Sequence, residues 1–114
     1  MITQRRREFS ESIGIQAEAK FVAACHAKGY VCKKSESQDN YGKHIDFYVK
    51  RPNDIISVDV KGNNFAQYIW VEFKNVKGDK GWLFGGADYI AFDMIKMYFF
   101  VVVKRSELER LCRT

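Results

Sequence analysis

The chain has 114 residues, a formal net charge of +5 and an aromatic content of 15%, which suits one well-packed core. A chain of this length does not build two separate cores, so we expect a single domain over residues 1–114. The three cysteines are widely spaced without a CxxC pair, which argues against a disulfide framework and a zinc site. No apolar stretch reaches membrane-spanning length and the charged start lacks a signal-peptide segment, so we expect an intracellular, cytoplasmic protein without a membrane partner.

Residues 10–28 have the pattern of a helix. Ser10 is a suitable N-cap, and Gly29 is a suitable stop just beyond the last turn. Glu18 borders the apolar stripe of this helix and can therefore face a sheet. Residues 1–9 are expected to form a basic arm. The stripe recurs at helical spacing and consists of Ile13, Ala17, Phe21, Ala24 and Cys25.

Two alternating segments predict a β-hairpin. Apolar and polar side chains alternate in residues 44–50 and again in residues 55–61, as they do in strands with one buried face. Residues 51–54 include Pro52 followed by asparagine and aspartate, a composition typical of a tight turn. The apolar row of the hairpin consists of Ile45, Phe47, Val49, Ile56, Val58 and Val60.

The opposite row of the hairpin has the groups of a metal-dependent hydrolase. If the apolar rows share one core, Asp46, Asp59 and Lys61 share the other face of the sheet. Two carboxylates on neighbouring strands can bind a hard cation such as Mg²⁺, and the carbonyl of Val60 could add a ligand. A lysine beside the metal can orient water or stabilise charge on a phosphate. Phosphodiester hydrolysis is the reaction that fits these groups.

The C-terminal part is expected to contribute further strands. Residues 68–76 alternate and predict a third strand, and residues 75–86 combine four glycines with large apolar groups around Trp82. We expect the Trp82 region to close one edge of the core; a loop that approaches DNA or a partner subunit is the alternative. The remaining expected elements are strands at residues 89–92 and 97–103 and a short helix from Ser106, with a helix over residues 87–95 as the alternative to the first of these strands.

The motifs resemble those of a known family. A glutamate on the first helix, an aspartate on the first hairpin strand and a (D/E)-x-K tripeptide on the second resemble the PD-(D/E)XK nuclease superfamily. This resemblance implies that Asp46 and Asp59 bind the metal, that Lys61 is the catalytic lysine and that Glu18 completes the site. One departure is Ile45, which stands where the family pattern has proline before the aspartate.

The resemblance covers residues 10–76. In its compact size and in the sequence of residues 42–47 and 56–61, the chain is most similar to Holliday junction resolvases and related small phage or archaeal-type endonucleases. The resemblance implies an α/β restriction-endonuclease-like core with a mixed central sheet flanked by helices. It also implies a Mg²⁺-dependent endodeoxyribonuclease, with Mn²⁺ as an alternative metal, that acts on branched DNA as a homodimer. A phage-encoded protein acting in the host cell is consistent with this resemblance.

A second arrangement of the site stays open. Glu72-Phe73-Lys74 is another (D/E)-x-K tripeptide, thirteen residues after Asp59, so Asp59, Glu72 and Lys74 could form the site instead. The first arrangement is favoured because the turn at Pro52 makes a tighter hairpin. The glycine-containing loop at residues 39–42 also suits the family pattern before Asp46. If the first arrangement is correct, Glu72 and Lys74 are a cross-strand polar pair on the surface of the sheet and not part of the site.

The positive charge is consistent with a polyanionic partner, because lysine and arginine contacts to phosphates drive nonspecific nucleic-acid binding. A nuclease for another DNA or RNA structure is one alternative to a junction nuclease. A non-catalytic nucleic-acid-binding module with the same fold is another, and a structural subunit that binds through the Trp82 region is a third. The candidate phosphate contacts are Arg5, Arg6, Arg7, Lys33, Lys34, Lys43, Lys74, Lys77 and Lys80.

Overall fold

The computed structural model describes residues 4–64, 69, 81–97 and 99–113, the side chains of residues 4–11, 39 and 41 excepted. Within these residues a five-stranded sheet has the order β1-β2-β3-β4-β5. Strands β3 and β4 are parallel and every other neighbouring pair is antiparallel. The elements in chain order are α1 (Gln4–Ala27), β1 (Val31–Lys34), α2 (Ser37–Lys43), β2 (Phe47–Lys50), β3 (Ile55–Asn63), the 3₁₀ helix η1 (Trp82–Phe84), β4 (Tyr89–Met94), β5 (Phe99–Lys104) and α3 (Arg105–Arg113).

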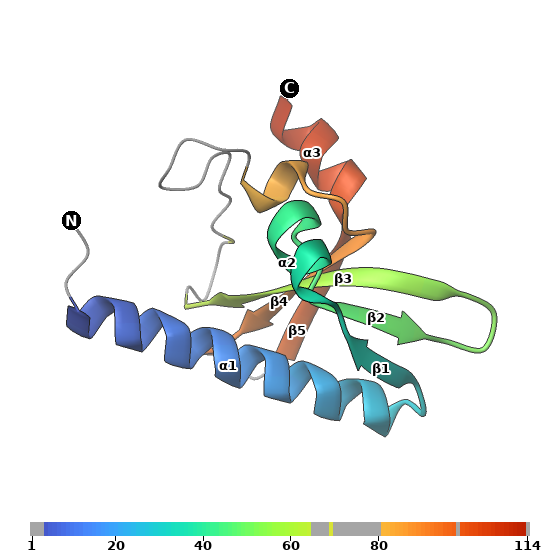
Figure 1. The fold of residues 1–114 in the computed structure, drawn as a ribbon, viewed down its shortest axis with the longest axis horizontal. Coiled ribbons are helices and arrows are strands. Elements are labelled where there is room, and N and C mark those ends of the chain that lie inside the picture. The colour runs from blue at the N-terminus through green and yellow to red at the C-terminus, as the bar shows by residue number, and fades with distance from the viewer. Residues whose placement is uncertain (1–3, 65–68, 70–80, 98, 114) are drawn as a thin grey trace.

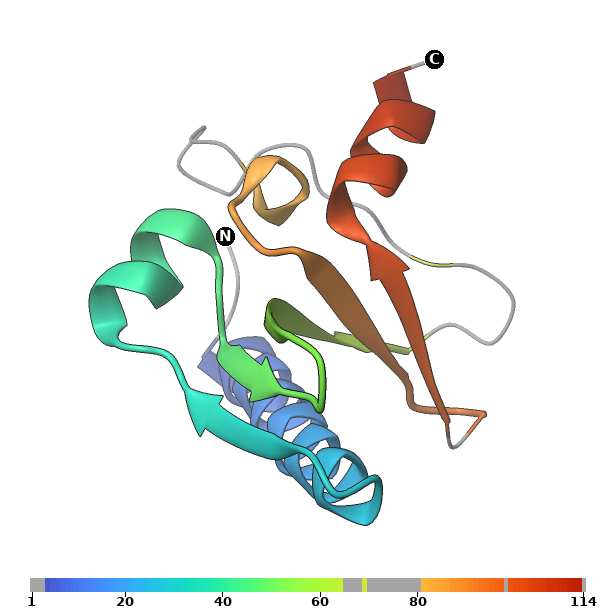
Figure 2. The same cartoon turned by 90° about the vertical axis from the view of Figure 1, so that its right-hand side faces the viewer.

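Helices lie on both faces of the sheet, which confirms an α/β fold with a mixed sheet flanked by helices. Helix α1 runs along one face, and α2, η1 and α3 lie on the other (Figures 1 and 2). Each face has its own apolar cluster: one packs α1 onto β2 and β3, and the other packs η1 and α3 onto β4 and β5. No helix within the described ranges is long and apolar enough to cross a membrane.

The predicted β-hairpin is confirmed. Strands β2 and β3 pair antiparallel with Phe47 opposite Val58. The turn between them is closed by the Arg51 N–H, which donates to the Asp54 carbonyl at 2.9 Å, and by an ion pair between their side chains. The polar row of β3 is covered as well, since Ser57 and Asp59 are as buried as the apolar row. At Ser57 and Asp59 the polar row therefore faces the interior of the protein.

Helix α1 is longer than the sequence predicted. It begins at Gln4, so Ser10 is not its N-cap, and residues 4–9 belong to this helix and not to a separate arm. It stops at Gly29 as expected, where φ is +78° and the N–H donates to the His26 carbonyl at 3.0 Å. Of the predicted stripe, Ala24 is exposed and Ile13 half-buried, and the buried members are Ala17, Phe21 and Cys25.

Two elements were not predicted. Strand β1, whose sequence is Val-Cys-Lys-Lys, is too short and too charged to show an alternating pattern, yet it forms the edge of the sheet beside β2. Residues 39–42 were expected to be a loop but lie in helix α2. His44 follows this helix with a left-handed φ of 55°, the conformation that commonly ends a helix but is uncommon for a residue other than glycine.

The C-terminal expectations are confirmed where the structure describes them. Strands β4 and β5 pair antiparallel, and α3 begins at Arg105, one residue before the predicted start. Trp82 and Leu83 are buried and pack against Phe92 and Ile90 of β4, so this region does close an edge of the core. The strand predicted at residues 68–76 lies outside the described residues, apart from Ile69.

Substitution of Gly62 by alanine is expected to destabilise the fold. A Cβ at Gly62 of β3 would lie 2.3 Å from Cγ2 of Ile13 on α1. We expect a loss of about 1–3 kcal/mol in the free energy of unfolding, measured by urea denaturation. Gly14→Ala is the control because a Cβ there meets nothing within 4 Å. Equal stability of Gly62→Ala and the parent would contradict this packing.

Candidate active site

The backbone of Asp46 is fixed between two strands. Asp46 directly precedes β2, and its N–H donates to the Val58 carbonyl of β3 at 2.9 Å. Its own carbonyl accepts from the N–H of Ser35, just after β1, at 2.9 Å. Since Phe47 pairs with Val58, the residue before Phe47 lies next to the residue after Val58. The antiparallel register therefore brings Asp46 beside Asp59.

The carboxylate of Asp46 is held at both oxygens. Oδ2 accepts from the N–H of Val60 at 2.7 Å, and Oδ1 accepts from Nδ2 of Asn40, on α2, at 2.6 Å. Hydrogen bonds to an ionised acceptor are short and comparatively strong, and two of them on different oxygens define the plane of the carboxylate. Each oxygen keeps a second lone pair for another partner.

Asp59 is the least solvated acid of the site. Its side chain is 2% exposed on β3, and no donor among the described residues lies within hydrogen-bond distance of Oδ2. Burial raises the pKa of Asp59 well above its usual value; the ammonium of Lys61 opposes this, and the Asp46 carboxylate adds to it. A buried polar atom without a partner costs about 1–3 kcal/mol, and more when charged.

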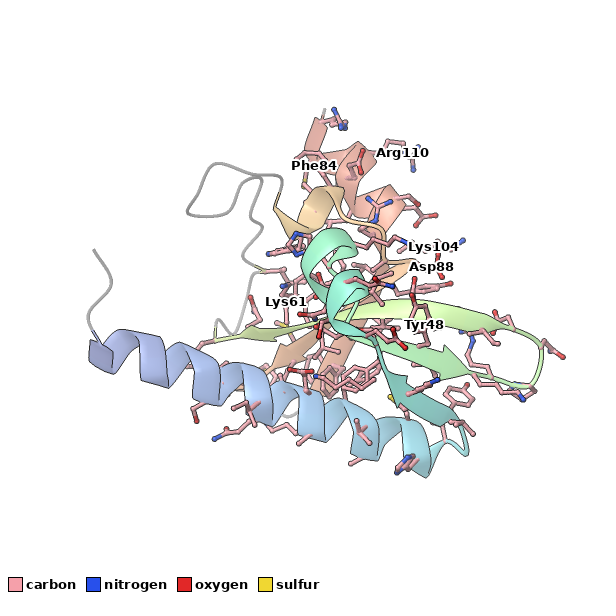
Figure 3. All side chains as sticks on the ribbon, viewed as in Figure 1. Tyr48, Lys61, Phe84, Asp88, Lys104 and Arg110 are labelled. Carbon is pink, nitrogen blue, oxygen red and sulfur yellow. The ribbon has the colours of Figure 1, made fainter. Side chains whose placement is uncertain are left out.

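Lys61 lies between Asp59 and an aromatic ring. Its Nζ is 3.4 Å from Oδ1 of Asp59 and 5.7 Å from the ring centroid of Trp82, a cation–π distance. The side chain is 31% exposed, so the ammonium can also reach a substrate. Figure 3 shows Lys61 on the side of the sheet where α2 lies, away from α1.

Helix α2 and the residues after η1 form the wall of the site. The N–H of Gly86 donates to the Lys43 carbonyl at 2.7 Å. A Cβ on Gly85 would lie 2.8 Å from the same carbonyl and 3.0 Å from Cβ of His44, so this contact requires glycine. The wall therefore joins the element that holds Asp46 to the element that contacts Lys61.

These groups fit a hard divalent cation. Mg²⁺ is commonly bound by one or two carboxylates and completes its shell with water and phosphate oxygens. Asp46 and Asp59 would provide the carboxylates, and a cation is the partner that the buried Oδ2 of Asp59 lacks. Val60 could add its carbonyl, because the N–H and C=O of one strand residue point to the same edge and this N–H points at Asp46.

Glu18 does not join these acids. Its carboxylate forms an ion pair with Nζ of Lys34 at 2.6 Å. Lys34 lies 5.3 Å from the ring of Phe47, which packs against α1, so this pair belongs to the α1 face of the sheet. In the part of the chain that the structure describes, no group of three or more acids, histidines or cysteines could hold a metal. The predicted role of Glu18 is therefore without structural support.

The candidate DNA contacts divide between the two faces. Lys33 pairs with Tyr48 and so points to the face of Asp59, whereas Lys34, the next residue, points to the α1 face. Lys43 ends α2 in the wall of the site. Arg5, Arg6 and Arg7 lie in α1, with side chains that are not described, and Glu72, Lys74, Lys77 and Lys80 lie outside the described residues.

No family model, curated protein or solved structure matches this chain. The assignment of the site therefore depends on its residues and their geometry. The sequence offered no signal for Asn40 as a partner of Asp46, because the contact joins a helix to the start of a strand. The sequence analysis assigned Trp82 to an edge of the core or to a binding loop, and its contact with Lys61 became visible in the folded chain.

Proposed function

We propose that this protein is a divalent-metal-dependent nuclease that hydrolyses phosphodiester bonds with Asp46, Asp59 and Lys61. The observation that carries the proposal is the buried carboxylate of Asp59, which has an oxygen without a partner among the described residues, a second carboxylate beside it and a lysine at 3.4 Å. A fold selected for stability alone has no reason to bury an acid in this way, and strongly perturbed acids are typical of functional sites.

Each side chain has a distinct part in the proposed chemistry. Asp46 and Asp59 hold Mg²⁺ or Mn²⁺, and the fixed carboxylate plane of Asp46 places its free lone pairs in advance. When bound, the metal supplies Lewis acidity toward the phosphate and lowers the pKa of a coordinated water. Lys61 forms a cation–π contact with Trp82. Its ammonium donates hydrogen bonds to the attacking water or to the phosphate oxygens as negative charge develops on them.

The order of the motifs along the hairpin supports the resemblance to PD-(D/E)XK nucleases. An aspartate precedes one strand of the hairpin and the Asp-x-Lys tripeptide lies in the other, as that resemblance predicts. A restriction-endonuclease-like core is part of this proposal. Glu18 of α1 is paired with Lys34 on the other face of the sheet, so the proposed catalytic set is Asp46, Asp59 and Lys61 without Glu18.

DNA is the proposed substrate, with branched DNA such as a four-way junction preferred. The net charge of +5 and the placement of Lys33 and Lys43 on the side of Lys61 support an anionic polymer as ligand. Preference for junctions and action as a homodimer follow from the family resemblance. Two symmetric cuts in one junction need two active sites. A small chain with one site provides two of them when it forms a homodimer.

A cleavage assay with matched substrates tests the proposed function. Four-way junction, flap, duplex and single-stranded DNA, with RNA versions of the last two, are incubated with Mg²⁺, with Mn²⁺ or with EDTA. We expect metal-dependent cutting that is fastest for the junction. Preferential cutting of another substrate would support the nuclease assignment and contradict the preference for junctions. Cutting of no substrate with either metal would overturn the proposal.

A non-catalytic nucleic-acid-binding module is the second candidate. It is favoured by the hydrogen bonds of Asp46, whose carboxylate also satisfies the N–H of Val60 and so supports the sheet. This candidate predicts binding without cutting in both metals and unchanged binding after Asp59→Ala. The nuclease predicts that Asp59→Ala binds DNA but does not cut it.

Asp46→Ala is expected to reduce cleavage at least about 100-fold, as is typical when a catalytic metal loses its ligand or that ligand's supporting bonds. The measurement is the single-turnover rate at saturating Mg²⁺. The N–H of Val60 loses its acceptor in this variant, so folding is checked by circular dichroism. The alternative arrangement of Asp59, Glu72 and Lys74 does not require Asp46. Loss of cleavage in Glu72→Ala with full activity in a folded Asp46→Ala would therefore assign the site to that arrangement.

DNA binding is expected to weaken with salt, and two adjacent lysines provide a matched comparison. Lys33 faces the site, whereas Lys34 points to the α1 face and is paired with Glu18. We expect Lys33→Gln to reduce the slope of log K against log salt by about 1, the value for one lost phosphate contact, and Lys34→Gln to leave it unchanged. Fluorescence anisotropy with Ca²⁺ in place of Mg²⁺ measures both slopes. Affinity that does not depend on salt would contradict the predicted phosphate contacts.

A further inference from the structure

We propose that Asn40 on α2 is a positioning residue for the carboxylate of Asp46, and that α2 exists in this fold to present it. This inference rests on the proposed function, because it assigns to Asn40 the orientation of a metal ligand. Its basis is the 2.6 Å contact from Nδ2 of Asn40 to Oδ1 of Asp46.

Asp46 needs a second constraint to be a well-oriented ligand. The Val60 N–H holds Oδ2 at 2.7 Å, but one contact allows the carboxylate to turn about its Cβ–Cγ bond. The Asn40 amide holds the other oxygen, and the same Nδ2 lies 3.4 Å from the Ile45 carbonyl, next to Asp46 in the chain. With both contacts made, the carboxylate keeps one plane before any cation arrives.

Asn40 is itself held by the backbone. Its N–H donates to the Glu36 carbonyl at 3.0 Å, and the end of α2 is tied by the 2.7 Å bond from Gly86 to Lys43. The segment after η1 thus anchors the helix that carries Asn40, while Trp82 of η1 contacts Lys61. One wall therefore supports both ends of the site, the Asp46 carboxylate and the Lys61 ammonium.

The amide of asparagine is suited to this position. It donates a hydrogen bond without adding charge, so it orients Asp46 and leaves the negative charge of the site to attract a cation. A lysine or arginine at this position would compete with the cation for the carboxylate, and an aspartate would offer no donor. Supporting hydrogen bonds of this kind typically change metal affinity or activity 10–100-fold when removed.

Mn²⁺ binding to folded variants tests this inference. Asn40→Leu removes the donor and keeps a branched side chain with the same number of heavy atoms, and Asn40→Ala removes it with a smaller side chain, so that one variant folds if the other fails. Gln38→Leu, on the exposed side of the same helix, controls for changes in α2. Free Mn²⁺ is measured by electron paramagnetic resonance, and cleavage is measured at saturating Mn²⁺.

We expect both Asn40 variants to bind Mn²⁺ about 10–100-fold more weakly, with Gln38→Leu unchanged. A merely structural role would lower the melting temperature of the metal-free variants and leave the Mn²⁺ affinity of the folded protein unchanged, which would overturn the inference. Absence of Mn²⁺ binding by the parent protein would instead overturn the proposed metal site, and this inference with it. The two failures are therefore distinguishable.

Discussion

Asp59→Asn is expected to abolish cleavage and, in the absence of metal, to make the protein more stable at neutral pH. The carboxylate of Asp59 is buried, and one of its oxygens has no partner within the described part of the chain, so its charge opposes folding. Asparagine has nearly the same shape and no charge, and its amide can donate to the neighbouring Asp46. We expect a gain of about 1–3 kcal/mol in the free energy of unfolding.

The pH dependence of stability has a definite sign. The pKa of Asp59 is raised in the folded state well above its usual value of 3.8, so the folded protein binds the proton more tightly than the unfolded chain. The contribution of Asp59 to the free energy of unfolding is fully present below its usual pKa and is lost as pH rises through the higher folded-state pKa. The stability advantage of Asp59→Asn should therefore appear above about pH 4 and grow until Asp59 is ionised.

Thermal unfolding of the two proteins between pH 4 and pH 8, with EDTA or Mg²⁺, measures this effect. A gain of 1 kcal/mol corresponds to roughly 4–8 °C in a small domain. Mg²⁺ should stabilise the parent and not Asp59→Asn, because only the parent holds the cation between two carboxylates. Glu107→Gln, at an exposed position in the first turn of α3, is the control for loss of one carboxylate. A metal-free Asp59→Asn less stable than the parent at pH 8 would contradict the buried-charge explanation.

Lys61→Met is expected to reduce the rate of cleavage about 100- to 1000-fold, the typical cost of removing one group that stabilises charge in the transition state. Methionine has an unbranched side chain like that of lysine but carries no charge. It also removes the cation that lies 3.4 Å from Asp59, so Mg²⁺ has one competitor fewer. Metal binding should therefore be retained or strengthened while catalysis is lost.

The measurement combines single-turnover cleavage with the Mg²⁺-dependent shift in melting temperature. Lys96→Met, in the exposed turn between β4 and β5, is the matched control and should preserve both. A Lys61→Met protein that loses the metal-dependent shift would assign Lys61 to the stability of the site, and one that cuts at the parental rate would remove it from the catalytic set.

Much of the hairpin could be predicted locally. Alternation in two short segments and a proline-containing turn assigned Asp46, Asp59 and Lys61 to one face, and the pairing of β2 with β3 confirms that arrangement. The face of a strand residue depends only on a period of two, so sequence is sufficient once the strand is recognised. The charged strand β1 was not recognised, so Lys33 and Lys34 were placed together although they point to opposite faces.

The sequence by itself determined that Asp46, Asp59 and Lys61, the groups of the proposed hydrolysis, lie on one face of two neighbouring strands. Only the tertiary structure decided that Asp59 is buried, that Asn40 and Val60 hold Asp46, and that Glu18 belongs to the opposite face. The physical reason is the range of the interactions. Alternation is a property of adjacent residues, whereas burial and electrostatic environment depend on α2 and η1, which reach the hairpin only when the chain has folded.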